Sequence, residues 1–78
     1  MKKLVLVVED GCPNCEYILS HLEKLGLMDY VEVVDRSKAN VRAVPAVIYD
    51  GEVDYVTGNV YGLIKILSYI KKLGGWSS

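Results

Sequence analysis

A nearly continuous run of branched apolar side chains, residues 3–8 (KLVLVV), constrains the fold more than any other feature of the sequence. A strand with one solvated face alternates apolar and polar residues, whereas a strand buried on both faces is apolar throughout. A chain of 78 residues has room for one sheet and one core. We therefore expect residues 3–8 to form an inner strand, within a single domain that spans residues 1–78.

A helix is expected to follow this strand after a turn at residues 9–12. It should cover residues 13–25, because Pro13 suits the first helical position, where its missing N–H would have no partner. Apolar side chains recur at helical spacing and form one stripe: Cys15, Ile18, Leu19, Leu22 and Leu25. Gly26 is a good terminator for such a helix.

The rest of the sequence predicts three more strands and a second helix. The strands are residues 30–34, 44–49 and 52–57, and the helix is residues 60–73. Asp50-Gly51 is typical of a two-residue hairpin turn between the last two strands, and Asn59 can cap the helix. The expected fold is α/β, in the order β-α-β-β-β-α, with a central mixed four-stranded sheet flanked by two main helices.

The connections fix the strand directions. The first two strands are joined through a helix and should be parallel, with a right-handed crossover, while a hairpin makes the last two antiparallel. If residues 44–49 lie beside residues 3–8 and run the opposite way, the polar segment 36–43 can connect without a full helix. This arrangement brings Pro45 close to the cysteines at the end of the first strand.

Composition and charge exclude several classes of protein. Hydrophobic residues make up 51% and charged residues 24% of the chain, which is typical of a globular domain. The formal net charge of -1 and the lack of a basic patch speak against nucleic acid as a partner. No apolar run approaches the ~20 residues that span a membrane. The first apolar run ends at Glu9 and Asp10 without a small-residue cleavage site, so we expect a cytoplasmic protein.

The two cysteines, Cys12 and Cys15, are too few for a disulfide-stapled scaffold. A disulfide between them would close a very short loop, and the entropic stabilisation would be only about 2 kcal/mol before strain. A chemical role explains the pair better than a stabilising role.

The position of the pair predicts different tasks for its two sulfurs. Cys12 falls at the N-cap, where free backbone N–H groups and the helix dipole favour a thiolate, the nucleophilic form. Cys15 lies one turn later on the apolar stripe, so it should be shielded yet within reach of Cys12. Cys12 would then attack a target disulfide and Cys15 would resolve the mixed disulfide. Pro13 and Asn14 shape the turn.

Other features of the sequence leave alternatives open. Glu9, Asp10 and Glu16 place negative charge near the sulfurs and oppose a thiolate, and no lysine or arginine stands close by in sequence. The pair could instead hold copper or zinc, because CxxC supplies two soft ligands. His21 is the remaining soft ligand, but its helical position should turn it away from Cys15. Buried cysteines can also serve packing alone.

The pattern over residues 3–73 resembles the thioredoxin-like superfamily in its small, glutaredoxin-like form. The motifs that carry the resemblance are CPNC (residues 12–15) between a strand and a helix, and Val44-Pro45 at the opening of a later strand. The resemblance implies a protein disulfide reductase, a thiol–disulfide oxidoreductase that carries electrons through a reversible Cys12–Cys15 disulfide, with no bound cofactor or metal. It also implies a cis Val44-Pro45 bond in a loop that contacts substrate.

The residues of the expected substrate groove include Val44, Pro45 and Gly58. Gly11 and Asn59 could line the same groove, but Gly11, Gly58 and Asn59 are equally well explained as ordinary turn and cap residues. Disulfide-containing proteins are the expected substrates, and a monomer is the expected state.

Departures from glutaredoxins speak against glutathione binding. The chain has Glu9 and Asp10 where glutaredoxins usually carry a basic residue, and TGN (residues 57–59) where they carry paired glycines. It also lacks the tryptophan of the thioredoxin motif WCGPC. The sequence is more similar to small redoxins with a glutaredoxin-like body, for which a thioredoxin-reductase-like flavoenzyme is the expected electron donor and glutathione the alternative.

Two rival functions remain on the same motif. Small copper or zinc chaperones also place CxxC between a strand and a helix, but their order continues strand, strand, helix, strand. The helix expected at residues 60–73, with no strand after it, favours the redoxin. A redox-inactive adaptor on the same fold is the other rival, and the presence of both Cys12 and Cys15 argues against it.

Overall fold

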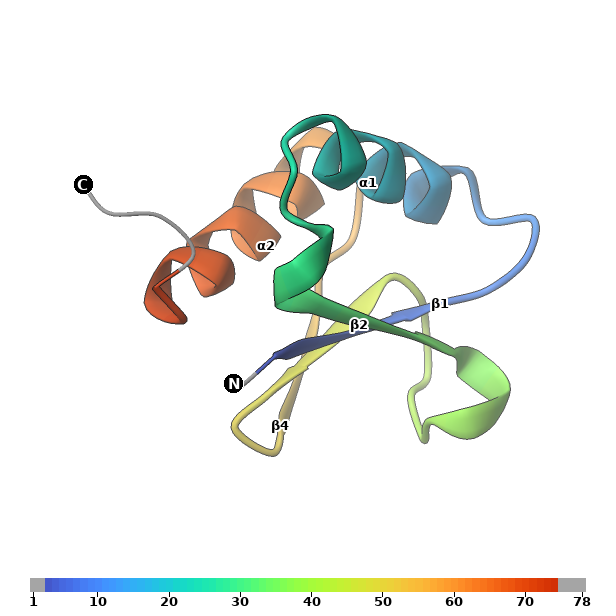
Figure 1. Ribbon diagram of the computed structural model, residues 1–78. Coiled ribbons are helices and arrows are strands. Elements are labelled where there is room, and N and C mark those ends of the chain that lie inside the picture. Colours follow the sequence, from blue (N-terminus) through green and yellow to red (C-terminus); the bar gives the residue numbers. More distant parts are fainter. Residues whose placement is uncertain (1–2, 75–78) are drawn as a thin grey trace.

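Four strands form one mixed sheet in the computed structural model, which describes residues 3–74 (Figure 1). The strands are β1 (Leu4–Val8), β2 (Val31–Asp35), β3 (Ala46–Tyr49) and β4 (Glu52–Tyr55), and their spatial order is β2-β1-β3-β4. β1 is parallel to β2 and antiparallel to β3, and β3 is antiparallel to β4. The expected α/β order and mixed four-stranded sheet are confirmed.

β1 is an inner strand, as its unbroken apolar sequence predicts. Leu4, Leu6 and Val7 are fully buried, and Val5 and Val8 are partly buried. Leu4 and Leu6 belong to the larger core cluster, whereas Val7 belongs to a second cluster on the opposite face. Alternate side chains of a strand point to opposite faces, so β1 contributes to the packing on both sides of the sheet.

Both helices, α1 (Pro13–Lys24) and α2 (Val60–Lys72), cover the same face of the sheet (Figure 1). Their apolar stripes meet in the larger core cluster together with the inward side chains of β1. The fully buried helical members of that cluster are Ile18, Leu22, Ile66 and Ile70. Within residues 3–74, neither helix is long and apolar enough to cross a membrane.

The opposite face of the sheet carries no helix in the described part of the chain. It is covered by the segment between β2 and β3, which contains one 3-10 turn, η2 (Arg36–Lys38). Val41 from this segment packs on Val7 and Ala46 in a small second cluster. The short polar connection expected from the sequence is therefore confirmed, and it makes this a two-layer structure. A second 3-10 turn, η1 (Met28–Tyr30), precedes β2.

Two details of the sequence prediction need correction. The strand expected from residue 44 begins at Ala46, because Pro45 has no N–H to donate to the sheet. Leu25, expected on the buried stripe, is 55% exposed, because α1 ends at Lys24 and Leu25 is only its C-cap. Leu27 instead enters the core, beyond the turn that ends the helix.

The predicted hairpin turn is confirmed. Asp50 and Gly51 both have positive φ, 53° and 83°, which is the combination that a two-residue type I′ turn requires. The turn places β4 at the edge of the sheet beside β3, with Ile48 opposite Val53.

Candidate functional site

Two loops that are far apart in sequence meet at one edge of the sheet. Residues 9–12 follow β1, and Val44-Pro45 comes directly before β3. β1 and β3 are antiparallel, with Val7 opposite Ala46, so the end of β1 and the beginning of β3 lie at the same edge. Pro45 therefore lies at the edge of the sheet where β1 ends and the chain continues to the two cysteines, as the sequence predicts.

Cys12 is the N-cap residue of α1, as the sequence predicts. Its backbone is extended (φ -94°, ψ 105°), and its Sγ accepts a hydrogen bond from the N–H of Cys15 at 3.2 Å. Pro13 occupies the first helical position and has no N–H to satisfy. The Cys12 sulfur thus accepts an N–H of the first turn that has no partner within the helix, and it lies at the positive end of the helix dipole. The hydrogen bond and the dipole each stabilise negative charge on sulfur. Cys12 is also partly exposed, which a nucleophile requires.

Cys15 occupies the opposite environment, since only 1% of its surface is exposed. Burial, reinforced by a hydrogen bond with the Cys12 side chain, raises the pKa of the Cys15 thiol from 9.0 to about 12. Both cysteines are free thiols in the structure. The pair therefore combines a partly exposed sulfur at a helix N-terminus with a protonated, shielded sulfur beneath it.

The Val44-Pro45 peptide bond is cis, as the resemblance implies. Pro45 is buried, and its carbonyl accepts a hydrogen bond from the N–H of Val56 at 3.1 Å. Within residues 3–74, neither the N–H nor the C=O of Val44 has a hydrogen-bond partner. Val44 therefore presents a free donor and a free acceptor at the edge that carries the cysteine loop, where an extended segment could pair with them.

The remaining predicted site residues have local structural roles. Gly58 has φ 81° between β4 and α2, and the Asn59 side chain caps α2 by accepting the N–H of Val60 at 2.6 Å. Gly11 has the same φ, 81°, in the cysteine loop. Asn14 lies in the first turn of α1, and its side chain bonds to none of the described residues. A substrate-binding role for Gly58 stays a prediction.

Arg36, which is distant in sequence from the cysteines, lies beside the loop that leads to Cys12. The Nη1 of Arg36 is 3.5 Å from Oε1 of Glu9, which is 27 positions earlier in the chain. The cause is the register of the parallel strands: Asp35 lies opposite Val8, so the next residues along both strands are neighbours. The acidic stretch before Cys12 is thus partly neutralised by Arg36, the residue that follows β2. Parallel pairing of the first two strands was the signal that could have revealed this contact.

A second arginine, Arg42, stands in the loop that leads to Pro45. Its N–H donates to the Tyr55 hydroxyl at 3.2 Å, and its guanidinium carbon lies 5.3 Å from the centre of the Tyr55 ring. Arg42, Ala43, Tyr55 and Thr57 line a surface hollow of about 310 Å³. Neither Arg42 nor Tyr55 was assigned to the site from the sequence. The place of Arg42 three residues before Pro45 was the available signal.

Further metal ligands are not gathered around the two cysteines in the described part of the chain. Within residues 3–74, no group of three or more His, Cys, Asp or Glu is placed to hold a metal ion. His21 lies on Tyr17, with ring centres 4.2 Å apart, and its Nδ1 bonds to the Tyr17 carbonyl at 2.9 Å. His21 is therefore engaged with α1 itself.

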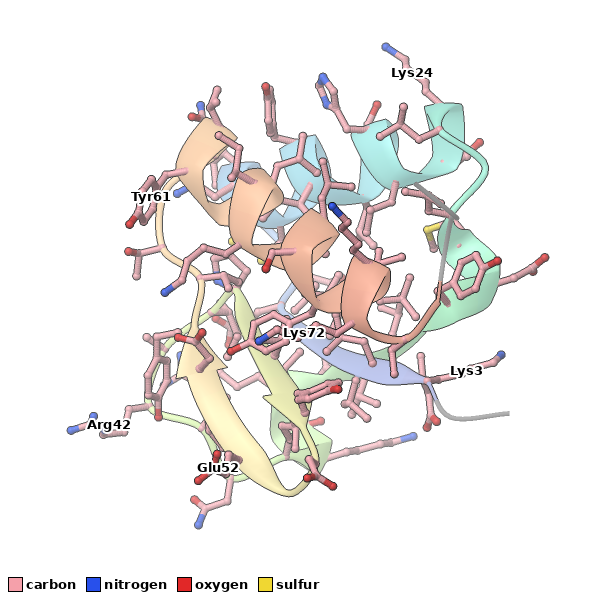
Figure 2. The ribbon with its side chains drawn as sticks, turned by 90° about the vertical axis from the view of Figure 1, so that its left-hand side faces the viewer. Lys3, Lys24, Arg42, Glu52, Tyr61 and Lys72 are labelled. Carbon is pink, nitrogen blue, oxygen red and sulfur yellow. The ribbon has the colours of Figure 1, made fainter. Side chains whose placement is uncertain are left out.

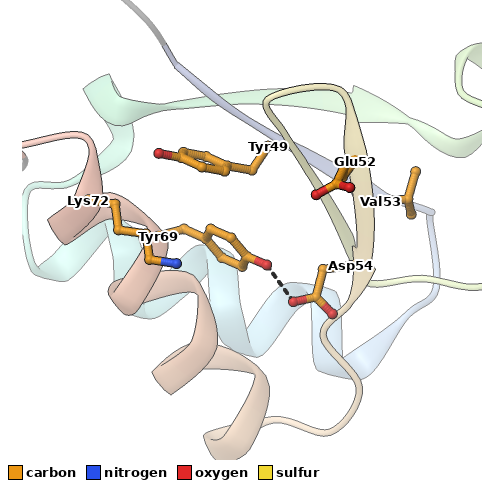
Figure 3. A pocket seen from close by; sticks show the side chains of 6 residues that line it. All are labelled: Tyr49, Glu52, Val53, Asp54, Tyr69 and Lys72. Atoms are coloured by element: carbon orange, nitrogen blue, oxygen red, sulfur yellow. Dashed lines mark hydrogen bonds between the residues drawn. The ribbon is translucent and has the colours of Figure 1, made fainter.

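Another hollow, of about 430 Å³, lies at the opposite end of the sheet, where Tyr49 and Glu52 flank the hairpin (Figure 3). The Tyr69 hydroxyl donates to Asp54 at 2.6 Å, and Lys65 lies 3.2 Å from the same carboxylate. The Tyr69 bond, with help from Lys65, holds the pKa of Asp54 below its usual value. Tyr69 and Lys65 of α2 contact Asp54 of β4, so the polar groups of this hollow join the helix to the sheet and have a structural role.

Comparison with known proteins bears on the fold alone. No family model matches the sequence, and the comparison with curated proteins finds no match. The structure is similar to the crystal structure of a mutant of the thioredoxin-like protein BC3987, with a TM-score of 0.60 and 19% sequence identity over 87% of this chain and 99% of that chain. This chain thus has a thioredoxin-like fold that carries a CxxC pair at the N-terminus of its first helix.

Proposed function

We propose that the protein is a small thiol–disulfide oxidoreductase that reduces protein disulfides through Cys12 and Cys15. One observation carries the proposal: the partly exposed Cys12 sulfur caps α1, while the buried Cys15 sits one turn behind it. A structural pair would need no such asymmetry, and a loop this short gives a disulfide little stabilising value.

In the first step the Cys12 thiolate attacks one sulfur of the substrate disulfide. A Cys12–substrate disulfide forms, the substrate S–S bond breaks, and the second substrate sulfur leaves as a thiolate that takes a proton from solvent. The Cys15 N–H that donates to the Cys12 sulfur stabilises charge on it and makes this sulfur the attacking group of the pair.

In the second step Cys15 loses its proton and attacks the Cys12 sulfur. The Cys12–Cys15 disulfide forms and the substrate leaves as a second thiolate, so two electrons pass from the protein to the substrate. The raised pKa of Cys15 keeps it protonated until the substrate is bound, which limits reaction of the shielded thiol with other oxidants.

The substrate is proposed to bind as an extended segment beside Val44. The free N–H and C=O of Val44 are suited to pair with such a strand, in the mode of strand addition. The Pro45 carbonyl accepts a hydrogen bond from the N–H of Val56, so this loop is already positioned before the substrate binds. Pre-organised docking of this kind lowers the entropic cost of binding.

The proposal includes the cellular setting expected from the sequence. The protein would act in the cytoplasm as a monomer without a resident cofactor. It would be returned to the dithiol state by a thioredoxin-reductase-like flavoenzyme or, failing that, by glutathione. The acidic residues Glu9 and Asp10 near the pair favour the flavoenzyme.

A redox titration of the metal-free protein tests the proposal directly. The protein is equilibrated in dithiothreitol and in glutathione buffers, which together cover both ranges of potential, the free thiols are labelled, and the mass reports the Cys12–Cys15 disulfide. A reversible two-electron couple is expected, with a midpoint of about -270 mV for a thioredoxin-like reductant or of about -200 mV for a glutaredoxin-like protein. Failure to form an intramolecular disulfide in any buffer would overturn the proposal and leave metal binding as the next function to test.

A further inference from the structure

The backbone of Arg42 is held by two hydrogen bonds, whereas its guanidinium forms no ion pair with a described carboxylate. The Arg42 carbonyl accepts a hydrogen bond from Nη2 of Arg36 at 2.9 Å, and its N–H donates to the Tyr55 hydroxyl. Within residues 3–74, no carboxylate lies within ion-pair distance of Arg42. A guanidinium presents five N–H donors in a rigid fork that matches a carboxylate. Arg42 is therefore positioned by its neighbours and is available to a charged ligand.

The surroundings of Arg42 favour negative charge. The N–H of Arg42, followed by its guanidinium, lowers the pKa of the Tyr55 hydroxyl, and the charge of Arg36 acts in the same direction. The Tyr55 ring lies beneath the guanidinium, an arrangement that orients arginine without neutralising it. An anionic group in the hollow lined by Arg42, Tyr55 and Thr57 would meet favourable charge from both arginines.

This hollow is continuous with the proposed docking edge. Ala43, which lines it, is the neighbour of Val44, whose backbone is free to pair with an extended segment. Residues in extended chains are spaced about 3.3 Å apart, so Arg42 lies within roughly 7 Å of Val44 along the chain. A side chain two positions from the attacked half-cystine would reach the hollow on the same face of the bound segment.

We infer that Arg42 selects disulfide substrates that carry a carboxylate about two residues from the half-cystine attacked by Cys12. The inference rests on the proposed function and adds a specificity determinant to it. The carboxylate is that of a glutamate or aspartate of a protein substrate. Glutathione carries its carboxylates on the residues next to its cysteine, and the experiment below tests it separately.

Single-turnover kinetics with short peptides tests this inference. Each peptide has one cysteine joined to 2-thiopyridine, a neutral group, and the peptides differ only in carrying Glu, Gln or Lys two residues before that cysteine. Attack by the reduced protein on the peptide sulfur forms the Cys12–peptide disulfide and releases thiopyridone, which is followed by absorbance. The reaction is run at low salt and at 1 M salt, with oxidised glutathione as a parallel substrate.

The wild-type protein should react about two- to fivefold faster with the Glu peptide than with the Gln peptide, the range of an exposed ion pair. The Lys peptide should be the slowest, and 1 M salt should remove the differences. Arg42→Ala should abolish the preference and Arg42→Glu should reverse it. Lys24→Ala is the matched control: Lys24 is also an exposed cation, but it projects from the opposite corner of the molecule (Figure 2), so its removal should leave the preference intact.

The outcomes separate the inference from the proposed function. Equal rates with the three peptides, or a preference that persists in Arg42→Ala, would overturn the role of Arg42 and leave the oxidoreductase standing. No reaction with any peptide would overturn both. If Arg42→Ala slows oxidised glutathione as much as the Glu peptide, glutathione also supplies the carboxylate; if only the peptide is slowed, the carboxylate is that of a protein.

Discussion

Arg36 reaches Glu9 across 27 positions of sequence, with its Nη1 3.5 Å from the Glu9 carboxylate. Its Nη2 donates to the carbonyl of Arg42 at 2.9 Å. One guanidinium therefore links the loop that leads to Cys12 with the loop that leads to Pro45. The link is exposed, since 38% of the Arg36 side chain and 49% of the Glu9 side chain are accessible, so it contributes to loop placement more than to global stability.

Replacing Arg36 by lysine should loosen the loop before Pro45. A lysine has one nitrogen and cannot bond to Glu9 and to the Arg42 carbonyl together. Hydrogen exchange at the amide of Arg42, whose N–H donates to the Tyr55 hydroxyl, should become faster, while the free energy of unfolding changes by less than about 1 kcal/mol. Lys38→Ala, on the same 3-10 turn, should change neither quantity. Unaltered exchange in Arg36→Lys would show that the guanidinium does not hold the loop.

Replacing each cysteine by serine should separate the two steps of exchange. Cys15→Ser leaves Cys12 able to attack but removes the resolving thiol, so a covalent complex with a disulfide substrate should accumulate. Cys12→Ser should form no complex and should not reduce insulin. Non-reducing electrophoresis and mass spectrometry identify the trapped species. Trapping by Cys12→Ser alone would reverse the assigned roles.

The buried thiol predicts a loss of stability at alkaline pH. In the unfolded chain Cys15 should ionise near its ordinary value of 9.0, whereas in the folded protein its pKa is raised to about 12. Above pH 9 the unfolded state therefore binds fewer protons, and the free energy of unfolding falls as pH rises from about 9 towards about 12. Urea unfolding of the reduced protein from pH 8 to pH 10 measures this slope. Cys15→Ala should flatten it, and an equally steep fall in that variant would contradict the assignment.

Local patterns in the sequence were sufficient to predict most of the fold. The apolar run of β1, Pro13 at the first turn of α1 and the Asp50-Gly51 turn each depend on neighbouring residues only. Their combination also predicted the antiparallel placement of β3 beside β1, and with it the position of Pro45. The ends of the helices and strands were predicted less accurately, because they depend on single hydrogen bonds such as that between Pro45 and Val56.

The side chains that organise the site could not be predicted in the same way. The contact between Arg36 and Glu9 depends on the exact register of β2 against β1, in which Asp35 lies opposite Val8. A slip of one residue would place the Arg36 side chain on the other face of the sheet. The partner of Arg42 likewise depends on β4, which places Tyr55 opposite Ala46.

The hydrogen bond between Tyr69 and Asp54 should stabilise the junction of α2 and β4 (Figure 3). Tyr69→Phe removes the hydroxyl and keeps the ring, so we expect a loss of about 1 kcal/mol and a fall in melting temperature of about 4–8 °C. The pKa of Asp54 is lowered by this bond from 3.8. The stabilising contribution is therefore complete above pH 3.8 and is lost as pH falls below it.

Thermal unfolding at pH 7 and at pH 3 measures the contribution of Tyr69. Tyr61→Phe is the control, because Tyr61 lies on the same helix and its hydroxyl bonds to none of the described residues. This control should have the same melting temperature as the wild type at both values of pH. A Tyr69→Phe protein as stable as the wild type at pH 7 would show that the bond contributes no net free energy.

Gly62 should be irreplaceable even by alanine, although alanine is the better helix former by about 1 kcal/mol. A Cβ at this position of α2 would lie 2.7 Å from the carbonyl oxygen of Val56 and 3.3 Å from that of Thr57. The first turn of α2 would have to move away from this backbone, and such overpacking costs about 1–3 kcal/mol. Val56 also bonds to Pro45, so the displacement should reach the proposed docking loop.

Urea unfolding should therefore show Gly62→Ala to be less stable than the wild type, and hydrogen exchange at Val56 should become faster. Ser68→Ala is the matched control, since Ser68 lies on an exposed position of the same helix. It should be neutral or slightly stabilising, because it changes helix propensity without a steric contact. A Gly62→Ala protein at least as stable as the wild type would show that α2 can shift away from the backbone of Val56 and Thr57 at no cost.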